Sequence, residues 1–456
     1  MNFRKWGLGT AVCLALVFAV AAEKAQRKMP KLLPWSQQIA VREGWLGKRH
    51  AMLLDMMRRH DVQMWMVVNE EFHDDPLTEF VAPPRVYTGG RDIFVFVDTG
   101  DKGLRKVAIT GYSEESVQKF FESDDNPKPA AEQLKMLWET FHPAHIALGI
   151  DGRRGVTRSL TKSSYDYLAD KMGPEAAKHF VPAQDLIIEY SETRLPEEFD
   201  TYNQMVVVTD LLTKRALSNE VITPGKTTVG DVRRWLYDQL WENRVTTWFQ
   251  PDLRVQRKTM DSSKSRGFLA VAKEGTVIMP GDLVHLDFGI TYMGFNTDWQ
   301  KMAYVLLPGE KKVPAGLQQA LKNTNELQDA MMLRAARPGR EGGEVYKLAM
   351  AEMEQKGITA MIYSHPIGDQ GHGLGASIDF RAAQTVNPTH ETVGPSSREI
   401  LHKGTYLSVE LNTQTAIPEW GGQKIYVMSE DDAYLTDDGY RFFQPRQTEF
   451  YLIRSK

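Results

Sequence analysis

The chain has 456 residues, of which 42% are hydrophobic and 25% charged, a composition typical of a globular protein that can bury a large core. Its formal net charge is −4, with acidic and basic residues interspersed, so no basic patch indicates nucleic acid as a partner. The length alone favours roughly two or three domains.

The first 22 residues have the pattern of a secretory signal peptide. Two basic residues precede an apolar run from Trp6 to Ala22, which ends in small residues. A run of about 17 apolar residues is at the short limit for a membrane span, so a retained anchor is the alternative. The small residues favour cleavage, and the only cysteine, Cys13, would leave with the signal. We therefore expect an exported protein, periplasmic or secreted, with no stable membrane anchor after cleavage.

Helical and strand-like segments alternate between residues 30 and 192. A long amphipathic helix is expected over 38–60, and shorter helical stretches separate the strand-like segments that follow it. This alternation is typical of an α/β domain. The expected strands are 63–68, 92–98, 105–110 and 145–151.

A domain boundary is expected between residues 192 and 193. Thr193 can cap a long helix that runs to about residue 220, because Pro196 is tolerated in a first turn and the glutamates after it suit the positive end of the helix. Helices and strands alternate again from there, with helices expected at 229–242, 315–334 and 344–356. The sequence thus predicts a second mixed domain, α/β (α+β), over 193–456.

Two aspartates of this second domain are predicted to face each other. In the segment 283–291, apolar residues alternate with His285 and Asp287, which places Asp287 on the face opposite the core. A turn centred between Tyr292 and Met293 would put Asp287 directly across from Asp298. Two carboxylates that close repel each other unless a cation lies between them. The alternative is a pair of solvated acids on an exposed sheet face.

Further candidate ligands follow along the chain. His372 is framed by glycines in a Gly-His-Gly-Leu-Gly segment, which clears space beside its imidazole. Glu410 lies on the polar face of a strand expected at 406–412, and Glu430 follows a strand expected at 424–429. His365 precedes His372 by seven residues, and a catalytic role is as open for it as a capping or core role. Four carboxylates and an imidazole suit two divalent ions that share a water.

The order of these residues resembles the pita-bread (M24-type) metallopeptidases. Asp-x10-Asp, then Gly-His-Gly, then two strand glutamates is the pattern of this family, which includes methionine aminopeptidase, aminopeptidase P, prolidase and creatinase. The resemblance extends from Thr193 to Lys456. The α/β segment before it is similar to the N-terminal domain that aminopeptidase P, prolidase and creatinase carry. The resemblance implies a creatinase-like N-terminal domain, a pita-bread catalytic domain and a homodimer.

The resemblance also implies a role for each candidate ligand. Asp287 would bind one ion, His372 and Glu410 would bind the other, and Asp298 and Glu430 would bridge both. Glu410 would also receive a proton and pass it to the leaving nitrogen. Mn²⁺ is the expected metal, and Zn²⁺, Co²⁺ or Fe²⁺ would also suit these ligands.

Three positions depart from the family pattern. The histidine usually found about 17 residues before the first aspartate is missing from the stretch around Ala270. Asp379 stands seven residues after His372, where the family has a second histidine, and Met428 stands where aminopeptidase P and prolidase tend to have an arginine. These positions orient the substrate rather than hold metal. His365 could replace one lost function, and His285 is a further candidate.

Three functions are compatible with these residues. The first is an exported, dinuclear metal-dependent exopeptidase similar to Xaa-Pro aminopeptidase, acting on peptides with proline at the second position. The second is a prolidase-like dipeptidase or another amide hydrolase on the same fold. The third is a binding protein without catalysis. Relatives without catalysis usually lose metal ligands, and all five are present here, which favours the first two functions.

Overall fold

The computed structural model describes residues 28–84, 87–112, 114–260, 264–265, 268–380 and 398–455. Leu32–Lys456 form one compact unit. Met1–Lys31 form a separate unit, of which residues 28–31 are described and contain no helix or strand. The predicted signal peptide therefore lies outside the described residues. So does the stretch 384–397 between His372 and Glu410, which is extra sequence relative to the family pattern and a candidate specificity loop.

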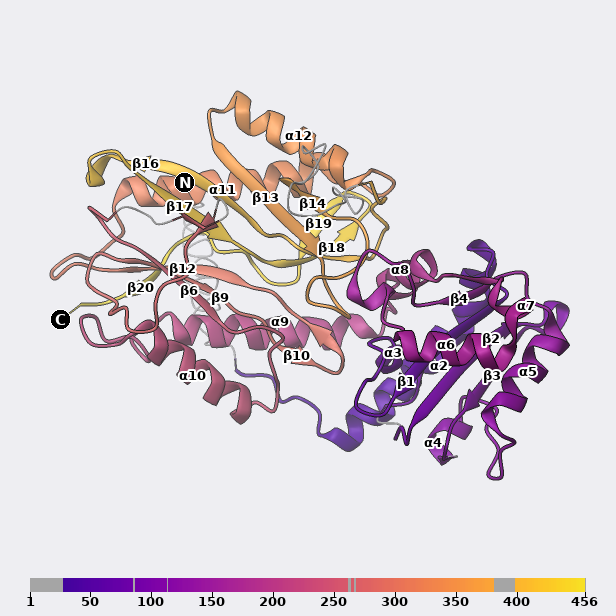
Figure 1. The fold of residues 1–456 in the computed structure, drawn as a ribbon. Helices are drawn as coiled ribbons and strands as arrows, with labels where there is room; N and C mark the ends of the chain where they lie inside the picture. The colour runs from indigo at the N-terminus through magenta and orange to yellow at the C-terminus, as the bar shows by residue number, and fades with distance from the viewer. Residues whose placement is uncertain are drawn as a thin grey trace, which may run out of the picture. The chain divides into compact units, whose positions relative to one another are not determined.

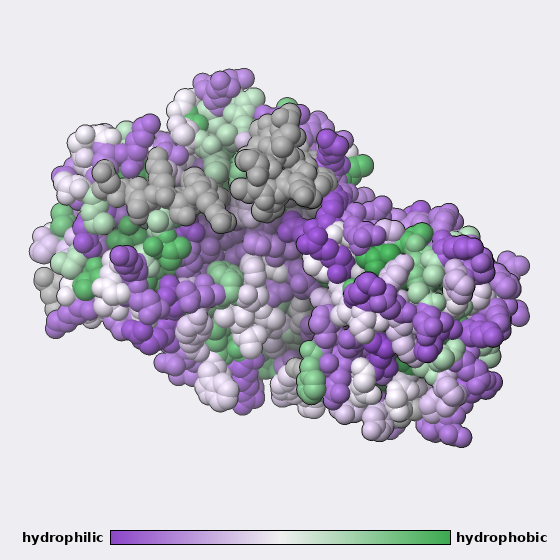
Figure 2. Space-filling model, in the orientation of Figure 1, coloured by the Kyte–Doolittle hydropathy of each residue, from purple (hydrophilic) through white to green (hydrophobic). Residues whose placement is uncertain are grey.

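Among the helices of the described residues, none is both long and apolar enough to cross a bilayer. On the face drawn in Figure 2, hydrophilic residues predominate and apolar residues form separate patches. Scattered apolar residues of this kind are ordinary on a folded protein surface.

A five-stranded mixed sheet organises the described residues up to Glu192 (Figure 1). Its strand order is β3-β2-β1-β4-β5, with antiparallel pairs on one side of β1 and parallel pairs on the other. The elements are α2 (Trp35–Arg59), β1 (Met64–Glu70), α3 (Thr78–Val81), β2 (Arg91–Asp98), β3 (Leu104–Ile109), α4 (Glu115–Gln118), α5 (Ala130–Phe141), β4 (Ile146–Leu148), α6 (Lys162–Met172), α7 (Pro174–Ala177), β5 (Phe180–Pro182) and α8 (Gln184–Glu192).

Helices cover both faces of this sheet. Successive side chains of β1 point to opposite faces, so Trp65 and Val67 share a core with α2 and α8, whereas Met64 and Met66 share one with α5 and α6. Strands buried on both faces need apolar residues at nearly every position, as β1 and β2 have. The result is the α/β architecture that the sequence predicts.

The rest of the chain builds a four-stranded sheet of order β20-β12-β9-β6 and a seven-stranded sheet that contains the path β17-β16-β13-β15-β18-β19 (Figure 1). Its elements are α9 (Glu198–Ala216), α10 (Val229–Glu242), β6 (Asp252–Gln256), β7 (Lys264–Ser265), β8 (Phe268–Leu269), β9 (Leu283–Asp287), β10 (Thr291–Tyr292), β11 (Phe295–Asn296), β12 (Gln300–Val305), α11 (Ala315–Asp329), a π-helical turn (Ala330–Ala335), α12 (Gly342–Gln355), β13 (Thr359–Pro366), β14 (Ile378–Asp379), β15 (Tyr406–Ser408), β16 (Leu411–Ile417), β17 (Gln423–Ser429), β18 (Asp432–Thr436), β19 (Gly439–Phe442) and β20 (Tyr451–Ile453).

Packing on α11 brings the four-stranded and seven-stranded sheets together. Leu317 and Leu321 of this helix share a core with Leu283 of β9, Met302 of β12 and Ile417 of β16. The backbones of Gln300 and Glu430 also form a bridge between β12 and the segment after β17. The predicted carboxylates lie around this junction.

Two of the sequence predictions for secondary structure are wrong. Thr193 ends α8 instead of capping α9, because its hydroxyl donates to the Glu189 carbonyl (2.8 Å) at the end of the preceding helix. Helix α9 starts at Glu198, whose carboxylate accepts from the Leu195 N–H (2.9 Å). The segment 246–255, which the sequence predicts as one strand, is extended only in its last part, as β6, Asp252–Gln256.

The register of the Asp287 hairpin also differs from the prediction. Asp287 lies opposite Gln300 instead of Asp298. The turn consists of Met293 and Gly294, which both have positive φ angles, as a type I′ turn requires. Methionine is uncommon at such a position, so the sequence gives no signal for this turn. Asp298 consequently lies in the irregular segment between β11 and β12.

Candidate metal centre

Side chains from five separate segments converge where the four-stranded and seven-stranded sheets meet. Asp287 ends β9, and Asp298 lies just before β12. Glu410 occupies the break between β15 and β16, and Glu430 lies between β17 and β18. His365 is the penultimate residue of β13. Positions at strand ends and breaks leave these side chains free of the regular alternation, so they can point to one centre.

His365 lies in the middle of this group. Its Nε2 is 3.6 Å from Asp298 Oδ2, 3.7 Å from Glu430 Oε1 and 3.8 Å from Glu410 Oε2. Its Nδ1 is 3.0 Å from the Pro366 carbonyl, which can only accept, so Nδ1 carries the proton and Nε2 presents its lone pair to the carboxylates. Histidines that bind metals commonly donate their other N–H in this way. Asp298, His365 and Glu430 could together hold a metal ion.

Buried negative charge is concentrated at this centre. The pKa values of Asp287, Asp298 and Glu430 are raised well above their ordinary range, first because burial disfavours the charged form and next because of the neighbouring carboxylates. One oxygen of each (Asp287 Oδ1, Asp298 Oδ1 and Glu430 Oε2) has no hydrogen-bond donor among the described residues. Buried carboxylate oxygens without donors are ligands that divalent cations prefer. The residues present therefore fit the metal that the resemblance implies.

The acids that follow Glu430 have protein partners. Asp431 accepts from Lys301 Nζ (2.6 Å) and Gln328 Nε2 (3.2 Å), and all three side chains are buried. Asp432 accepts from the backbone N–H of Asp298 (3.3 Å). The acidic run 430–432 is therefore buried, although such runs are usually solvated surface.

His372 lies beside His365. The two rings are 4.6 Å apart between centroids and nearly perpendicular, and His372 is exposed. It also packs against the rings of Trp248 and Tyr363. Trp248 lies over Gly371, where an added Cβ would come within 2.3 Å of the indole. The glycine next to His372 thus makes room for Trp248.

An arginine from a neighbouring strand lies beside Met428, the position of the missing family arginine. Arg254 Nη1 is 4.0 Å from Met428 Sδ, and Arg254 Nη2 forms a 2.7 Å ion pair with Asp252. Asp252 lies opposite Asp287 in the pairing of β6 with β9. The charge of Arg254 therefore lowers the pKa of Asp287, against the larger effect of burial. Sequence reasoning missed this arginine, because its relation to Asp287 arises from sheet pairing.

The two other departure positions lie elsewhere in the site region. Asp379 is buried in β14, opposite Tyr363 of β13. Ala270 directly follows β8, and the carbonyl of its neighbour Leu269 accepts from Arg254 Nη1 (2.8 Å).

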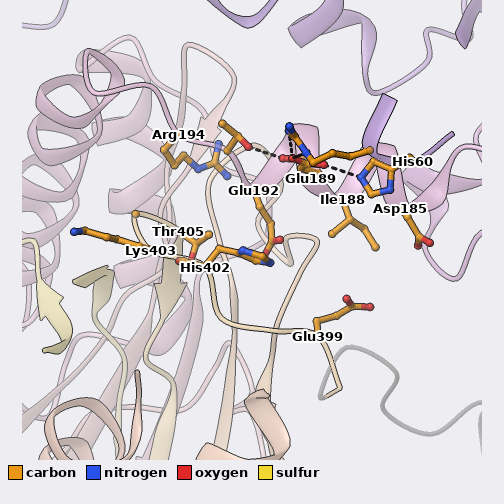
Figure 3. A pocket seen from close by; sticks show the side chains of 13 residues that line it. His60, Asp185, Ile188, Glu189, Glu192, Arg194, Glu399, His402, Lys403 and Thr405 are labelled. Carbon is orange, nitrogen blue, oxygen red and sulfur yellow. Dashed lines mark hydrogen bonds and ion pairs between the residues drawn. The ribbon is translucent and has the colours of Figure 1, made fainter. Parts of the chain in front are cut away.

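A separate cavity of about 580 Å³ shares no lining residue with the carboxylates (Figure 3). Glu189 on its wall is paired with Arg59, and with His60 at 2.7 Å, the latter contact being a dashed line in Figure 3. Burial raises the pKa of Glu192 to about 8, and the Ala376 N–H donates to this carboxyl (3.4 Å). The described lining residues are Arg59, His60, Asp185, Ile188, Glu189, Glu192, Thr193, Arg194, Glu399, His402, Lys403, Gly404 and Thr405.

Solved structures share this fold over most of the chain. The X-Pro aminopeptidase from Thermotoga maritima MSB8 aligns with a TM-score of 0.63 and 15% identity, covering 87% of this chain and 99% of that one. The Xaa-Pro dipeptidase from Bacillus anthracis aligns with a TM-score of 0.61 and 17% identity, covering 89% and 99%. At such identities the likeness shows the fold alone. The chain thus has the mixed α/β architecture of the pita-bread peptidases, as the resemblance implied.

The sequence comparison points to the same class. Residues 212–437 match metallopeptidase family M24. The uncharacterized peptidase YqhT of Bacillus subtilis (strain 168) is 32% identical over 183 residues, which cover 39% of this chain and 43% of YqhT, less than half of that relative. Residues 212–437 are therefore similar to the peptidases of this family. The family is metal-dependent, and the buried group around His365 is where a metal could bind.

Proposed function

We propose that this protein is a dinuclear metal-dependent exopeptidase that releases the N-terminal residue from peptides with proline at the second position. The observation that carries the proposal is the position of His365 Nε2, within 3.6–3.8 Å of carboxylates from three segments. Four carboxylates and one imidazole match two hard or borderline ions better than one. Mn²⁺ is the metal we propose, with Zn²⁺, Co²⁺ or Fe²⁺ as alternatives. The residues that would hold it are Asp287, Asp298, His365, Glu410 and Glu430.

In this proposal His365 and His372 exchange the roles inferred from the sequence. The glycines around His372 favoured it as the ligand, but the nitrogen that faces the carboxylates belongs to His365. His372 then follows the metal histidine by seven residues, which is the family spacing of the second, substrate-side histidine. With this assignment Asp379 no longer departs from the family pattern.

The chain's own groups would orient the substrate and move the proton. Bound divalent ions would supply Lewis-acid activation of water and of the scissile carbonyl. Glu410 Oε2 lies 3.8 Å from His365 Nε2, and this carboxylate would receive the proton from water and deliver it to the leaving nitrogen. His372 is exposed beside the centre and would donate a hydrogen bond to the substrate.

An aromatic wall beside the centre supports the proline preference. Trp248 and Tyr363 flank His372, and Phe380 lies 6.0 Å from the Tyr363 ring at an interplanar angle of 31°. Flat apolar rings suit the proline ring of a substrate. The fold likeness to an X-Pro aminopeptidase and an Xaa-Pro dipeptidase is consistent with this class of substrate.

The test is a peptide panel. The protein would be reconstituted with Mn²⁺ and given Xaa-Pro-Yaa tripeptides and Xaa-Pro dipeptides, with products followed by mass spectrometry and Asp287→Ala as the inactive control. Release of the first residue from the tripeptides by the wild type alone supports the proposal. Cleavage of dipeptides only would favour the prolidase-like alternative. Bound metal without peptide cleavage would direct the search to other amides, and neither metal nor cleavage would favour a binding protein.

Export and a homodimer belong to the same proposal. Export rests on the pattern of residues 1–22, and the dimer rests on the family resemblance. Cell fractionation would test the first, with the protein expected outside the cytoplasm. Light scattering of the purified protein would test the second, with twice the chain mass expected.

A further inference from the structure

Gln300 contacts three of the proposed metal-binding residues. Its side-chain Nε2 donates to Glu410 Oε1 (2.9 Å) and to Asp287 Oδ2 (3.2 Å). Its backbone N–H donates to the Glu430 carbonyl (3.1 Å), and the Glu430 N–H donates to the Gln300 carbonyl (3.2 Å). Gln300 is 4% exposed. One buried residue thus joins ligands from three separate segments.

The hydrogen bonds fix which way the Gln300 amide points. Both N–H groups of the amide are used by the carboxylates of Asp287 and Glu410, which can only accept when ionised. The reversed amide would place its oxygen against two acceptors. In the observed orientation, Gln300 Oε1 faces His285 Nε2 at 2.9 Å, so this nitrogen must carry a proton.

His285 is the hydrogen-bond donor behind the amide. It is 1% exposed, and its Nε2 faces Gln300 Oε1. Its Nδ1 has no hydrogen-bond partner among the described residues. The ring therefore directs its Nε2 donor to Gln300.

We propose that Gln300 is a positioning residue, whose amide holds Asp287 and Glu410 in the orientation that binds metal, and that His285 fixes the direction of the amide. This inference rests on the proposed dinuclear function. The amide of a glutamine suits this role better than a charged side chain would. A lysine at this place would neutralise the carboxylates, as Lys301 does for Asp431, and would compete with a metal. An amide supplies two donors and leaves the negative charge for the ions.

The experiment measures Mn²⁺ affinity and steady-state kinetics in matched variants. Gln300→Met keeps the volume and removes both donors. His285→Leu removes the donor behind the amide, and His285→Gln keeps one. Gln256→Met is the control, because Gln256 is also a buried glutamine whose side chain joins two strands, through Tyr426 N and O at 2.7 Å, without touching the carboxylates.

We expect Gln300→Met to weaken Mn²⁺ binding by roughly 10–100-fold and to lower kcat by a similar factor, while KM changes little, because partners of metal ligands have effects of this size. His285→Leu should weaken binding in the same direction by about tenfold, and His285→Gln should restore most of that loss. Gln256→Met should affect thermal stability without changing Mn²⁺ affinity.

Unchanged Mn²⁺ affinity in Gln300→Met overturns the inference, as does an equal loss in Gln256→Met, which would indicate a general effect of sheet disruption. If Gln300→Met does not fold, the two His285 variants decide, and equal affinity in both overturns the inference. A wild type that binds no Mn²⁺ would contradict the proposed function itself. The two failures are therefore distinguishable.

Discussion

Two groups of buried acids in this protein differ in what neutralises them. In the first, Glu198 is paired with Arg49 (2.8 Å) and Asp369 with Arg194, and all four side chains are at most 8% exposed. In the second, around His365, neighbouring carboxylates add to burial in raising the pKa values of Asp287, Asp298 and Glu430, whereas in the first group arginines oppose the effect of burial on the pKa of Glu198. This difference separates buried acids with a structural role from buried acids with a functional role. Where the chain supplies the cation the acids hold the fold, and where it does not we propose that a bound metal ion supplies the positive charge.

The largest expected effect is the loss of a bridging ligand from the second group. Asp298→Asn keeps the shape of the side chain but removes its charge, so the activity on an Xaa-Pro-Yaa peptide should fall by on the order of 10³-fold or more. Because a repelling carboxylate is removed, the metal-free variant should be at least as stable as the metal-free wild type. Peptidase assays and thermal melts of chelator-treated protein measure the two effects. Full activity in Asp298→Asn would show that the second group of acids is not required for catalysis.

The first group should respond in the opposite way. Arg194→Met leaves Asp369 buried without its cation, which should destabilise the protein by about 3–5 kcal/mol, the usual effect of removing one partner of a buried pair. Mn²⁺ stoichiometry of the folded variant should remain that of the wild type. Urea denaturation measures the loss of stability, and metal analysis measures the Mn²⁺ stoichiometry. Adding Asp369→Asn to Arg194→Met should recover part of the free energy of unfolding. No recovery would show that an unpaired Asp369 charge is not the cause of the lost stability.

Much of the fold could be predicted from local pattern. The helix expected at 229–242 forms with those bounds as α10, since its capping box between Thr228 and Asp231 is a local signal. Four of the five strands of the first sheet lie within a few residues of the predicted ones, and the clearest of them, β1 and β2, are buried on both faces and strongly apolar. The short, partly exposed β5 is absent from the predictions.

The site was harder to predict, because it depends on register and on strand breaks. Asp287 and Asp298 interact as expected, although the turn at Met293 and Gly294 sets Gln300 opposite Asp287. The predicted strand around Glu410 is interrupted, which frees its side chain. Local glycines pointed to His372, whereas the pairing of His365 with Ser408 across β13 and β15 is non-local and places His365 at the centre. Long-range pairing of this kind leaves no signal in a short window of sequence.

The smallest expected effect concerns Glu192, a buried acid beside the cavity of Figure 3. Its pKa of about 8 is raised by burial and by Glu399 and Glu189, whereas Arg194 acts in the other direction. Between the ordinary value of 4.5 and about 8, the folded protein binds a proton that the unfolded chain does not. The contribution of Glu192 to stability is therefore complete below about pH 4.5 and is lost as pH rises through about 8.

Glu192→Gln imitates the protonated carboxyl, so this variant should match the wild type near pH 5 and exceed its stability near pH 9, by on the order of 1–3 kcal/mol. Denaturation curves at both pH values measure the difference. Glu189→Gln is the matched control. Burial acts against the hydrogen bonds of Arg59 and His60, but those bonds leave the pKa of Glu189 lowered, so this variant should gain no stability at pH 9. The same gain in both variants would contradict the assignment to Glu192.

The central claim is that the carboxylates around His365 bind two metal ions, with His365 as the histidine ligand. The most direct test is the metal content of wild type, His365→Ala and His372→Ala after dialysis against Mn²⁺. The account predicts two ions per chain in the wild type and in His372→Ala, and fewer than two in His365→Ala. Two ions in His365→Ala with a loss in His372→Ala would restore the assignment made from the sequence. No bound metal in the wild type would contradict the account as a whole.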